Sequence, residues 1–138
     1  MADQVQFELV APERLLISDE VEMVVVPGAE GDFGVLPGHA PFISTVRPGV
    51  ISVYENGAVG RRVFVSGGFS EVTSERCTVL ADEAISLDDV DRAAAESRLR
   101  AAEQADNDAE DDADHVSATA ELEISRALLV AVERADRG

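Results

Sequence analysis

The residues of this chain that could do chemistry are few, and their spacing fits no catalytic or metal-binding pattern. The two histidines, His39 and His115, have no cysteine or histidine partner at metal-ligand spacing. His39 lies beside Gly38 and Ala40, and it is predicted to form a hydrogen bond within a loop. The single cysteine, Cys77, is predicted to be a small buried hydrophobe in a strand.

The glycine and serine patterns are equally plain. Gly28, Gly31 and Gly34 follow neither the dinucleotide fingerprint nor the phosphate-loop spacing, and no Lys-Ser or Lys-Thr pair follows them. Ser66 and Ser70 have no credible histidine and acid partners. These glycines are therefore predicted to shape turns, and the serines are not predicted to be nucleophiles.

An acidic run from Asp106 to Asp114 has acids at alternate positions, as a calcium loop does. The sixth and twelfth positions of such a loop would be Asp111 and Ser117, where an EF-hand needs glycine and glutamate. A solvated connector is the better interpretation. With no catalytic residues, metal ligands or cofactors predicted, the chemistry indicates a binding or mechanical part and not an enzyme.

The composition excludes several classes of partner. The 138 residues hold 28 acids against 11 bases, all of them arginine, and the net charge is −17. Binding to nucleic acid or anionic lipid needs cationic patches, so neither is expected. No signal peptide is recognised and the apolar runs are short, so no membrane insertion is expected.

Residues 1–85 are predicted to form a β domain. Alternating or β-branched runs are separated by turn signals, and Asn56-Gly57 is a strong hairpin signal. Many short strands of this kind indicate a sandwich or flattened barrel. The expected strands are Val5–Val10, Leu15–Ile17, Val21–Val26, Val50–Tyr54, Ala58–Val65, Phe69–Val72 and Cys77–Ala81.

The stretch from Gly28 to Gly49 is dense in proline and glycine. Such a composition disfavours helices and central strands, so it is predicted to be a shaped surface turn system. Loops on a rigid scaffold often carry function, which makes this stretch the first candidate site. Its predicted buried anchors are Phe33, Val35, Leu36, Phe42 and Ile43, and Phe7, Phe64 and Phe69 are expected to be the other large core pieces.

Residues 86–138 change to a helical period. Ser86 and Asp89 suggest a capping box, and a first helix is predicted to run to about Ala105. A second helix is predicted from about Ser117 to Arg134, so the two would form an antiparallel hairpin joined by the acidic connector. The expected apolar positions are Leu87, Val90, Ala94, Ala101 and Ala105 on the first helix, and Ala120, Ile124, Ala127, Leu128 and Ala131 on the second.

Two segments in order carry a resemblance to a known family: GDFGVLPGHAPFISTVRPG at Gly31–Gly49 and VSGGFSEVTSERCTVLADEA at Val65–Ala84. Followed by an alanine-rich hairpin, they resemble the epsilon subunit of F-type proton-translocating ATP synthase over nearly the whole chain. The resemblance implies a flattened ten-stranded β-sandwich (1–85) that binds gamma and the c ring, then a regulatory two-helix hairpin (86–138).

The resemblance also implies a function and a location. The chain would be a non-catalytic rotor subunit of the central stalk, coupling hydrogen ion transport through the c ring to ATP synthesis in the alpha–beta head. It would be peripheral on the cytoplasmic face of the bacterial inner membrane. Glu30, Asp32 and Phe33 would contact the c ring, and His39 and Ser44 would lie close to gamma.

In this family the hairpin can reach the alpha and beta subunits, block ATP hydrolysis or bind ATP. Asp89, Arg92 and Arg126 match family positions for ATP, but Asp88 replaces an apolar motif residue and Val130 replaces an arginine. Acids also offset the arginines of the last helix. Weak or absent ATP binding is therefore predicted, and strong charge-driven inhibition is not expected.

Two alternatives remain open from the sequence. One is a stand-alone β-sandwich binding module that oligomerises through its hairpin, which would purify without partners. The other is an ATP-sensing regulator, which an ATP titration would reveal.

Overall fold

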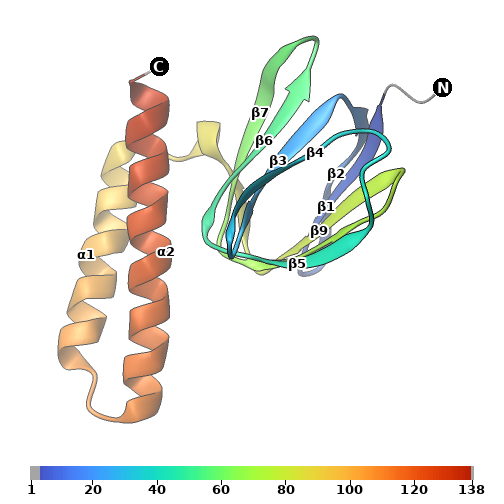
Figure 1. Cartoon of the computed structure of the whole chain (residues 1–138). Helices are drawn as coiled ribbons and strands as arrows, with labels where there is room; N and C mark the ends of the chain where they lie inside the picture. The colour runs from blue at the N-terminus through green and yellow to red at the C-terminus, as the bar shows by residue number, and fades with distance from the viewer. Residues whose placement is uncertain (1–3, 138) are drawn as a thin grey trace. The chain divides into compact units, whose positions relative to one another are not determined.

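The structure, a computed structural model, describes residues 4–137 of the chain. It consists of two compact units, one ending at Ser86 and the other beginning at Leu87. The first unit is all β and the second is helical (Figure 1).

Ten strands build the first unit, most of them short and alternating in burial. The strands are β1 (Val5–Ala11), β2 (Arg14–Val21), β3 (Met23–Gly28), β4 (Gly31–Val35), β5 (Phe42–Val46), β6 (Gly49–Glu55), β7 (Ala58–Val65), β8 (Gly68–Val72), β9 (Arg76–Ala81) and β10 (Ala84–Ser86).

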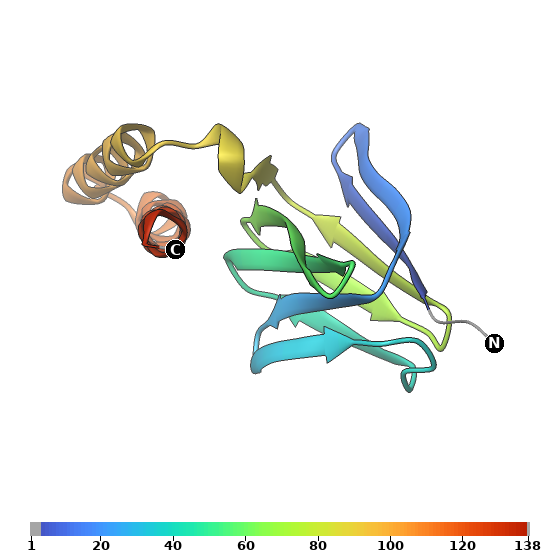
Figure 2. The same cartoon turned by 90° about the horizontal axis from the view of Figure 1, so that it is seen from above.

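The strands follow one hydrogen-bonded path in the order β10-β7-β6-β3-β5-β8-β9-β1-β2, and β4 pairs with β3 beside this path. Within the described residues, β1 and β9 pair in parallel and the other strand pairs are antiparallel. The sheet that these strands form is curved (Figure 2). This ten-stranded, mostly antiparallel architecture confirms the predicted sandwich followed by two helices.

The core of the β unit follows from strict alternation along the strands. In β1, Val5, Phe7 and Leu9 are fully buried and their neighbours face outward. The same rule places mostly valine from the other strands around Phe7. The prediction that Phe69 belongs to the core is wrong: its side chain is 58% exposed, because it faces the outer side of β8.

The β6–β7 connection confirms the predicted hairpin. Asn56 and Gly57 have φ angles of 56° and 78°, which are the left-handed values that a two-residue type I′ turn requires. The turn sets the register that pairs Glu55 with Ala58.

The stretch from Gly28 to Gly49 is more regular than its composition predicts. It contains β4 and β5, and β3 extends through Pro27 to Gly28, beyond the predicted end at Val26. Leu36 and Ile43, predicted as buried anchors, are exposed. The reason for Ile43 is that β5 turns Phe42, Ser44 and Val46 toward one side and Ile43 toward the other.

The second unit begins with a single 3₁₀ turn, Leu87–Asp89, followed by α1 (Arg92–Asp108) and α2 (Asp112–Asp136). The predicted capping box at Ser86 is wrong, because Ser86 belongs to β10 and pairs with β7. Asp91 caps α1 instead, by accepting a hydrogen bond from the Ala94 amide at 2.8 Å.

The two helices lie side by side and run antiparallel (Figures 1 and 2). The connection is shorter than predicted, because Asp111 caps α2 and the helix starts at Asp112. The predicted stripe of α1 is shifted by one residue: Ala95 and Ala102 are buried, whereas Ala94, Ala101 and Ala105 are exposed.

On α2 the predicted stripe is partly right. Leu128 and Ala131 are buried, Ile124 and Ala127 are half-buried and Ala120 is exposed. The buried positions of α2 are Ala118, Leu122, Ser125, Leu128, Ala131 and Val132. Within residues 4–137, neither helix is long and apolar enough to cross a membrane.

Candidate partner-binding surfaces

The β3–β4 turn brings three predicted contact residues together. Gly28 pairs with Gly31 across the turn, which leaves Glu30 exposed at its tip and Asp32 exposed at the start of β4. Phe33 is half-buried, and its ring packs edge-on against Phe42 with centroids 4.9 Å apart. The turn therefore exposes the two carboxylates of Glu30 and Asp32 close to the packed rings of Phe33 and Phe42.

One arginine, which the sequence analysis did not single out, holds this turn. Arg47 donates hydrogen bonds to the carbonyl oxygen of Gly28 and to Oδ1 of Asp32. Its main-chain amide donates to the Pro27 oxygen at 2.9 Å. The signal available in the sequence was weak, because the partners of Arg47 lie 15 and 19 residues away.

His39 and Ser44, predicted to lie close to gamma, have different surroundings. The Nδ1 atom of His39 lies 2.8 Å from the Ala40 carbonyl oxygen, so His39 makes the predicted loop hydrogen bond. Its ring is 5.3 Å from that of Phe42. Ser44 shares the face of Phe42, whereas its neighbour Ile43 faces outward and is 71% exposed. Ile43 and Thr45 are therefore the exposed side chains of β5.

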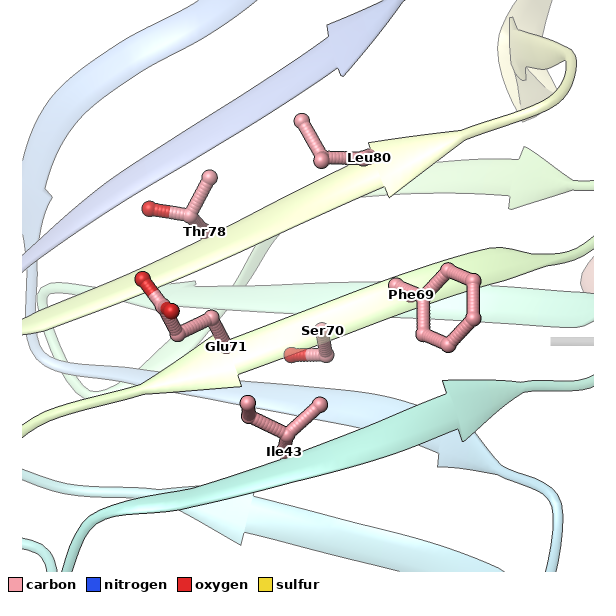
Figure 3. Close-up of a pocket in the computed structure, with 6 residues that line it drawn as sticks. All are labelled: Ile43, Phe69, Ser70, Glu71, Thr78 and Leu80. Atoms are coloured by element: carbon pink, nitrogen blue, oxygen red, sulfur yellow. The ribbon is translucent and has the colours of Figure 1, made fainter.

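Three adjacent strands carry an exposed apolar surface that the sequence analysis missed. Ile43 on β5, Phe69 on β8 and Leu80 on β9 are all more than half exposed, and Phe69 pairs with Leu80 across the sheet. They border a shallow hollow of about 200 Å³, which Ser70, Glu71 and Thr78 also line (Figure 3). Glu71 supplies the one carboxylate among these six lining residues.

The register extends this surface onto two more strands. Leu80 pairs with Val10 on β1, and Val10 pairs with Leu15 on β2, which is 61% exposed. Residues paired across strands point to the same face. Leu15, Ile43, Phe69 and Leu80 therefore form one outer apolar patch. Contiguous exposed apolar surface of this kind marks interaction sites.

The residues predicted as ATP contacts do not form a free cationic pocket. Arg92, at the start of α1, donates to Glu96 and to Glu133 of α2, both at 2.9 Å. Arg126 is exposed on α2, and no interaction is found for it among residues 4–137. Asp89 lies in the 3₁₀ turn. Arg92 is thus already paired with two carboxylates.

A second arginine of α1 joins the two helices. Nε of Arg98 donates to Glu121 at 2.7 Å, and Ser125, which is fully buried, also donates to Glu121 at 3.3 Å. The hydrogen bond from Arg98 is the main cause that holds the pKa of Glu121 below its ordinary value, against the opposing effect of burial. Glu121 is therefore a fixed anion between the helices.

Cys77 is buried in β9, as predicted, and it lies 3.9 Å from the Ser70 hydroxyl. Burial raises the pKa of its thiol to about 11. A thiol of this kind is not a nucleophile at neutral pH. Among the described residues, no three side chains of the metal-binding types are gathered to hold a metal ion.

The fold and sequence match one family of proteins. Residues 4–87 match the family model described as ATP synthase, Delta/Epsilon chain, beta-sandwich domain. An ATP synthase epsilon chain of Rhodospirillum rubrum is 56% identical over 131 residues, which cover 95% of this chain and 98% of the relative. One from Paramagnetospirillum magneticum is 52% identical over 132 residues, covering 96% and 99%. The chain therefore belongs to the family of ATP synthase epsilon chains.

Solved structures agree with this assignment. A chain in the mitochondrial ATP synthase of Euglena gracilis, solved as OSCP/F1/c-ring in rotational state 1, superposes with a TM-score of 0.82 at 25% identity. The match covers 96% of this chain and 83% of that one. A chain of the Tetrahymena thermophila central stalk/c-ring structure has a TM-score of 0.66 at 11% identity, over 93% and 96% of the two chains, and shares the fold.

Proposed function

We propose that this chain is a non-catalytic rotor subunit of F-type ATP synthase. Its β unit would join the gamma subunit to the ring of c subunits and so help couple proton flow to ATP synthesis. Family membership supports this role, and so do the titles of the matched complexes, which name a central stalk and a c ring. The location that follows is the cytoplasmic face of the inner membrane, reached through protein partners.

The observation that carries the proposal is the outer apolar patch of Leu15, Ile43, Phe69 and Leu80. Burying such exposed side chains against another protein removes apolar surface from water. The favourable free energy is about 25 cal/mol for each Å² of apolar surface that is buried. Glu71 adds a charge that selects a cationic side chain on the partner. We assign this patch to gamma and the acidic β3–β4 turn to the c ring.

Support for the absence of catalysis comes from the chemistry of the described residues. The buried Cys77 thiol has a raised pKa, and Arg92 is already paired with Glu96 and Glu133.

The helical unit would serve regulation, by contacting the alpha and beta subunits. A direct test of ATP binding is calorimetry of the isolated protein with low millimolar ATP, in which we expect no saturable heat.

The patch can be tested with the double variant Ile43→Ser/Phe69→Ser. We expect its affinity for the purified gamma subunit to fall about tenfold or more, as for central interface residues. The matched control is Val116→Ser, because Val116 is 71% exposed on α2, outside the patch. Equal binding by the double variant and the wild type would remove the patch from the gamma contact.

The proposed division of labour can be tested by ending the chain after Leu87. Because both proposed stalk contacts lie in the β unit, we expect the shortened chain to enter the complex and to support ATP synthesis. Proton pumping and ATP hydrolysis by the reconstituted enzyme are the measurements. Loss of coupling would show that the helices carry the stalk contacts, and a rise in hydrolysis would show that they inhibit.

A further inference from the structure

We propose that Arg47 is a positioning residue for the c-ring contact: its guanidinium fixes the β3–β4 turn and the Asp32 carboxylate in a binding-ready arrangement. The inference rests on the proposed function, because it concerns the turn that we assign to the c ring. Arg47 itself follows β5 and lies outside the turn.

The first step of the argument is the number of anchors that converge on the turn. One nitrogen of Arg47 donates to the Gly28 carbonyl at the base of the turn, and another donates to Asp32 on the opposite strand. The Ala29 amide donates to the Thr45 oxygen at 2.9 Å. The side chain of Arg47 thus ties both strands of the turn together, and the main chain ties the turn to β5.

The second step is the type of side chain. A guanidinium is planar and carries five donors in a rigid fork, so it can serve a carbonyl and a carboxylate at once in fixed directions. A lysine ammonium is a single charged centre on a flexible stem and cannot reproduce that fork. The position therefore favours arginine for its geometry in addition to its charge.

The third step is the distribution of charge on the turn. Oδ1 of Asp32 accepts a hydrogen bond from Arg47, whereas Glu30 has no partner among residues 4–137. Arg47 therefore assigns different roles to the two acids. Glu30 is the free carboxylate that a cationic loop of the c ring would meet, and Asp32 is oriented beside it.

The fourth step separates binding from folding. The side chains of Arg47 and Asp32 are 41% and 60% exposed, and ion pairs this open contribute little to the stability of a domain. A turn that is already ordered loses less conformational freedom when it binds, so the same pair can matter for affinity. We therefore expect Arg47 substitutions to weaken binding without unfolding the β unit.

The first experiment measures the turn in the isolated full-length chain. Amide hydrogen exchange at Ala29 to Asp32 should become about fivefold faster in Arg47→Gln, because the openings that expose these amides are no longer opposed by the two side-chain bonds. Arg47→Lys should lie between Arg47→Gln and the wild type. The control is Arg62→Gln, because Arg62 is exposed on β7 with no partner among the described residues. Unchanged exchange in Arg47→Gln would overturn the positioning role and leave the proposed function standing.

The second experiment measures binding to c rings purified in detergent from the ATP synthase that contains this chain. We expect Arg47→Gln to bind about fivefold to tenfold more weakly and Arg62→Gln to bind as the wild type does. The double variant Arg47→Gln/Asp32→Asn completes a double-mutant cycle. Its fold-loss of affinity should be smaller than the product of the fold-losses of the two single variants, because the two residues act as one unit. Multiplicative effects would contradict the inference. Failure of the wild type itself to bind the c ring would overturn the proposed function, and the inference with it.

Discussion

The β unit and the helical unit are stabilised by different forces. In the β unit, fully buried side chains from many strands surround Phe7, Leu9 and Ile51. Stabilisation of this kind is roughly proportional to the apolar area that is removed from water. The strands also come from distant parts of the chain, so a local change is resisted by the whole sheet.

The helical unit has a thinner apolar seam and relies more on charge. Alanine provides much of that seam, and α1 buries only Ala95 and Ala102. Arg92 and Arg98 of α1 pair with Glu133 and Glu121 of α2. The same chain therefore combines a β unit stabilised by its apolar core with a helix pair whose packing also depends on a few ion pairs.

The largest expected effect is on the β core. Phe7→Ala should lower the free energy of unfolding of the β unit by about 3–5 kcal/mol, because it leaves a large cavity in a closely packed interior. Fluorescence of Tyr54, the single tyrosine of the chain, reports on β6, and ellipticity at 222 nm reports on the helices. Only the tyrosine transition should shift.

The matched control for that variant is Phe69→Ala, which removes the same side chain from the exposed patch. Its effect on unfolding should stay within about 0.5 kcal/mol, as for most surface substitutions. Similar losses in the two variants would contradict the placement of Phe7 inside and Phe69 outside.

A smaller effect is expected between the helices. Arg98→Ala should destabilise the helical unit by about 1 kcal/mol, because it removes a two-point pair with Glu121 that is only partly screened by water. Ellipticity at 222 nm during thermal unfolding is the measurement. Arg100→Ala provides the control, since Arg100 is exposed and without a partner among the described residues. Equal effects of the two would show that Arg98 acts through helix propensity alone.

A weaker, pH-dependent effect should follow from Glu121. Its pKa in the folded chain is lowered from the ordinary value of 4.5, so its contribution to stability is complete above pH 4.5. That contribution is lost as the pH falls through the lower folded-state value. We therefore expect the stability difference between the wild type and Glu121→Gln to shrink under acid. Comparing the two chains at each pH cancels the effects of the other carboxylates, and a constant difference would exclude the pair with Arg98 as the cause.

The last prediction is that a substitution in the helical unit leaves the reactivity of Cys77 in the β unit unchanged. Cys77 is buried, and the pKa of its thiol is raised to about 11, so a thiol reagent should label it only when the sheet opens. Arg98→Ala loosens the helices alone and should leave the labelling rate unchanged, whereas Phe7→Ala should raise it. A higher rate in Arg98→Ala would show that the two units unfold together.

Much of the β unit was predictable because its rules are local. Alternation identified most strands, and Asn56-Gly57 fixed one hairpin. The outer apolar patch was not predictable, since Leu15, Phe69 and Leu80 become neighbours only through the register of several strands. The partners of Arg47 were hidden for the same reason.

The helices show a different limit. Ala93, Ala94 and Ala95 are consecutive, so an apolar stripe could be drawn through any of them, and only packing selects Ala95. The sequence predicted a capping box at Ser86 and Asp89, but the pairing of β10 with β7 holds Ser86 in a strand, and Asp91 caps α1 instead. The contact roles of Glu30, Asp32, Phe33, His39 and Ser44 stay predictions, because they concern partner chains.

The parallel pair of β1 and β9 has a consequence for biosynthesis. The first strand cannot complete its hydrogen bonds until residues 76–80 have left the ribosome, so nascent β1 and β2 can form only an isolated hairpin, which is marginally stable. The contacts between α1 and α2, in comparison, join residues within the last third of the chain. We therefore expect ribosome-bound fragments that end before Arg76 to be digested readily by protease, and those that extend well past Ala81 to resist it.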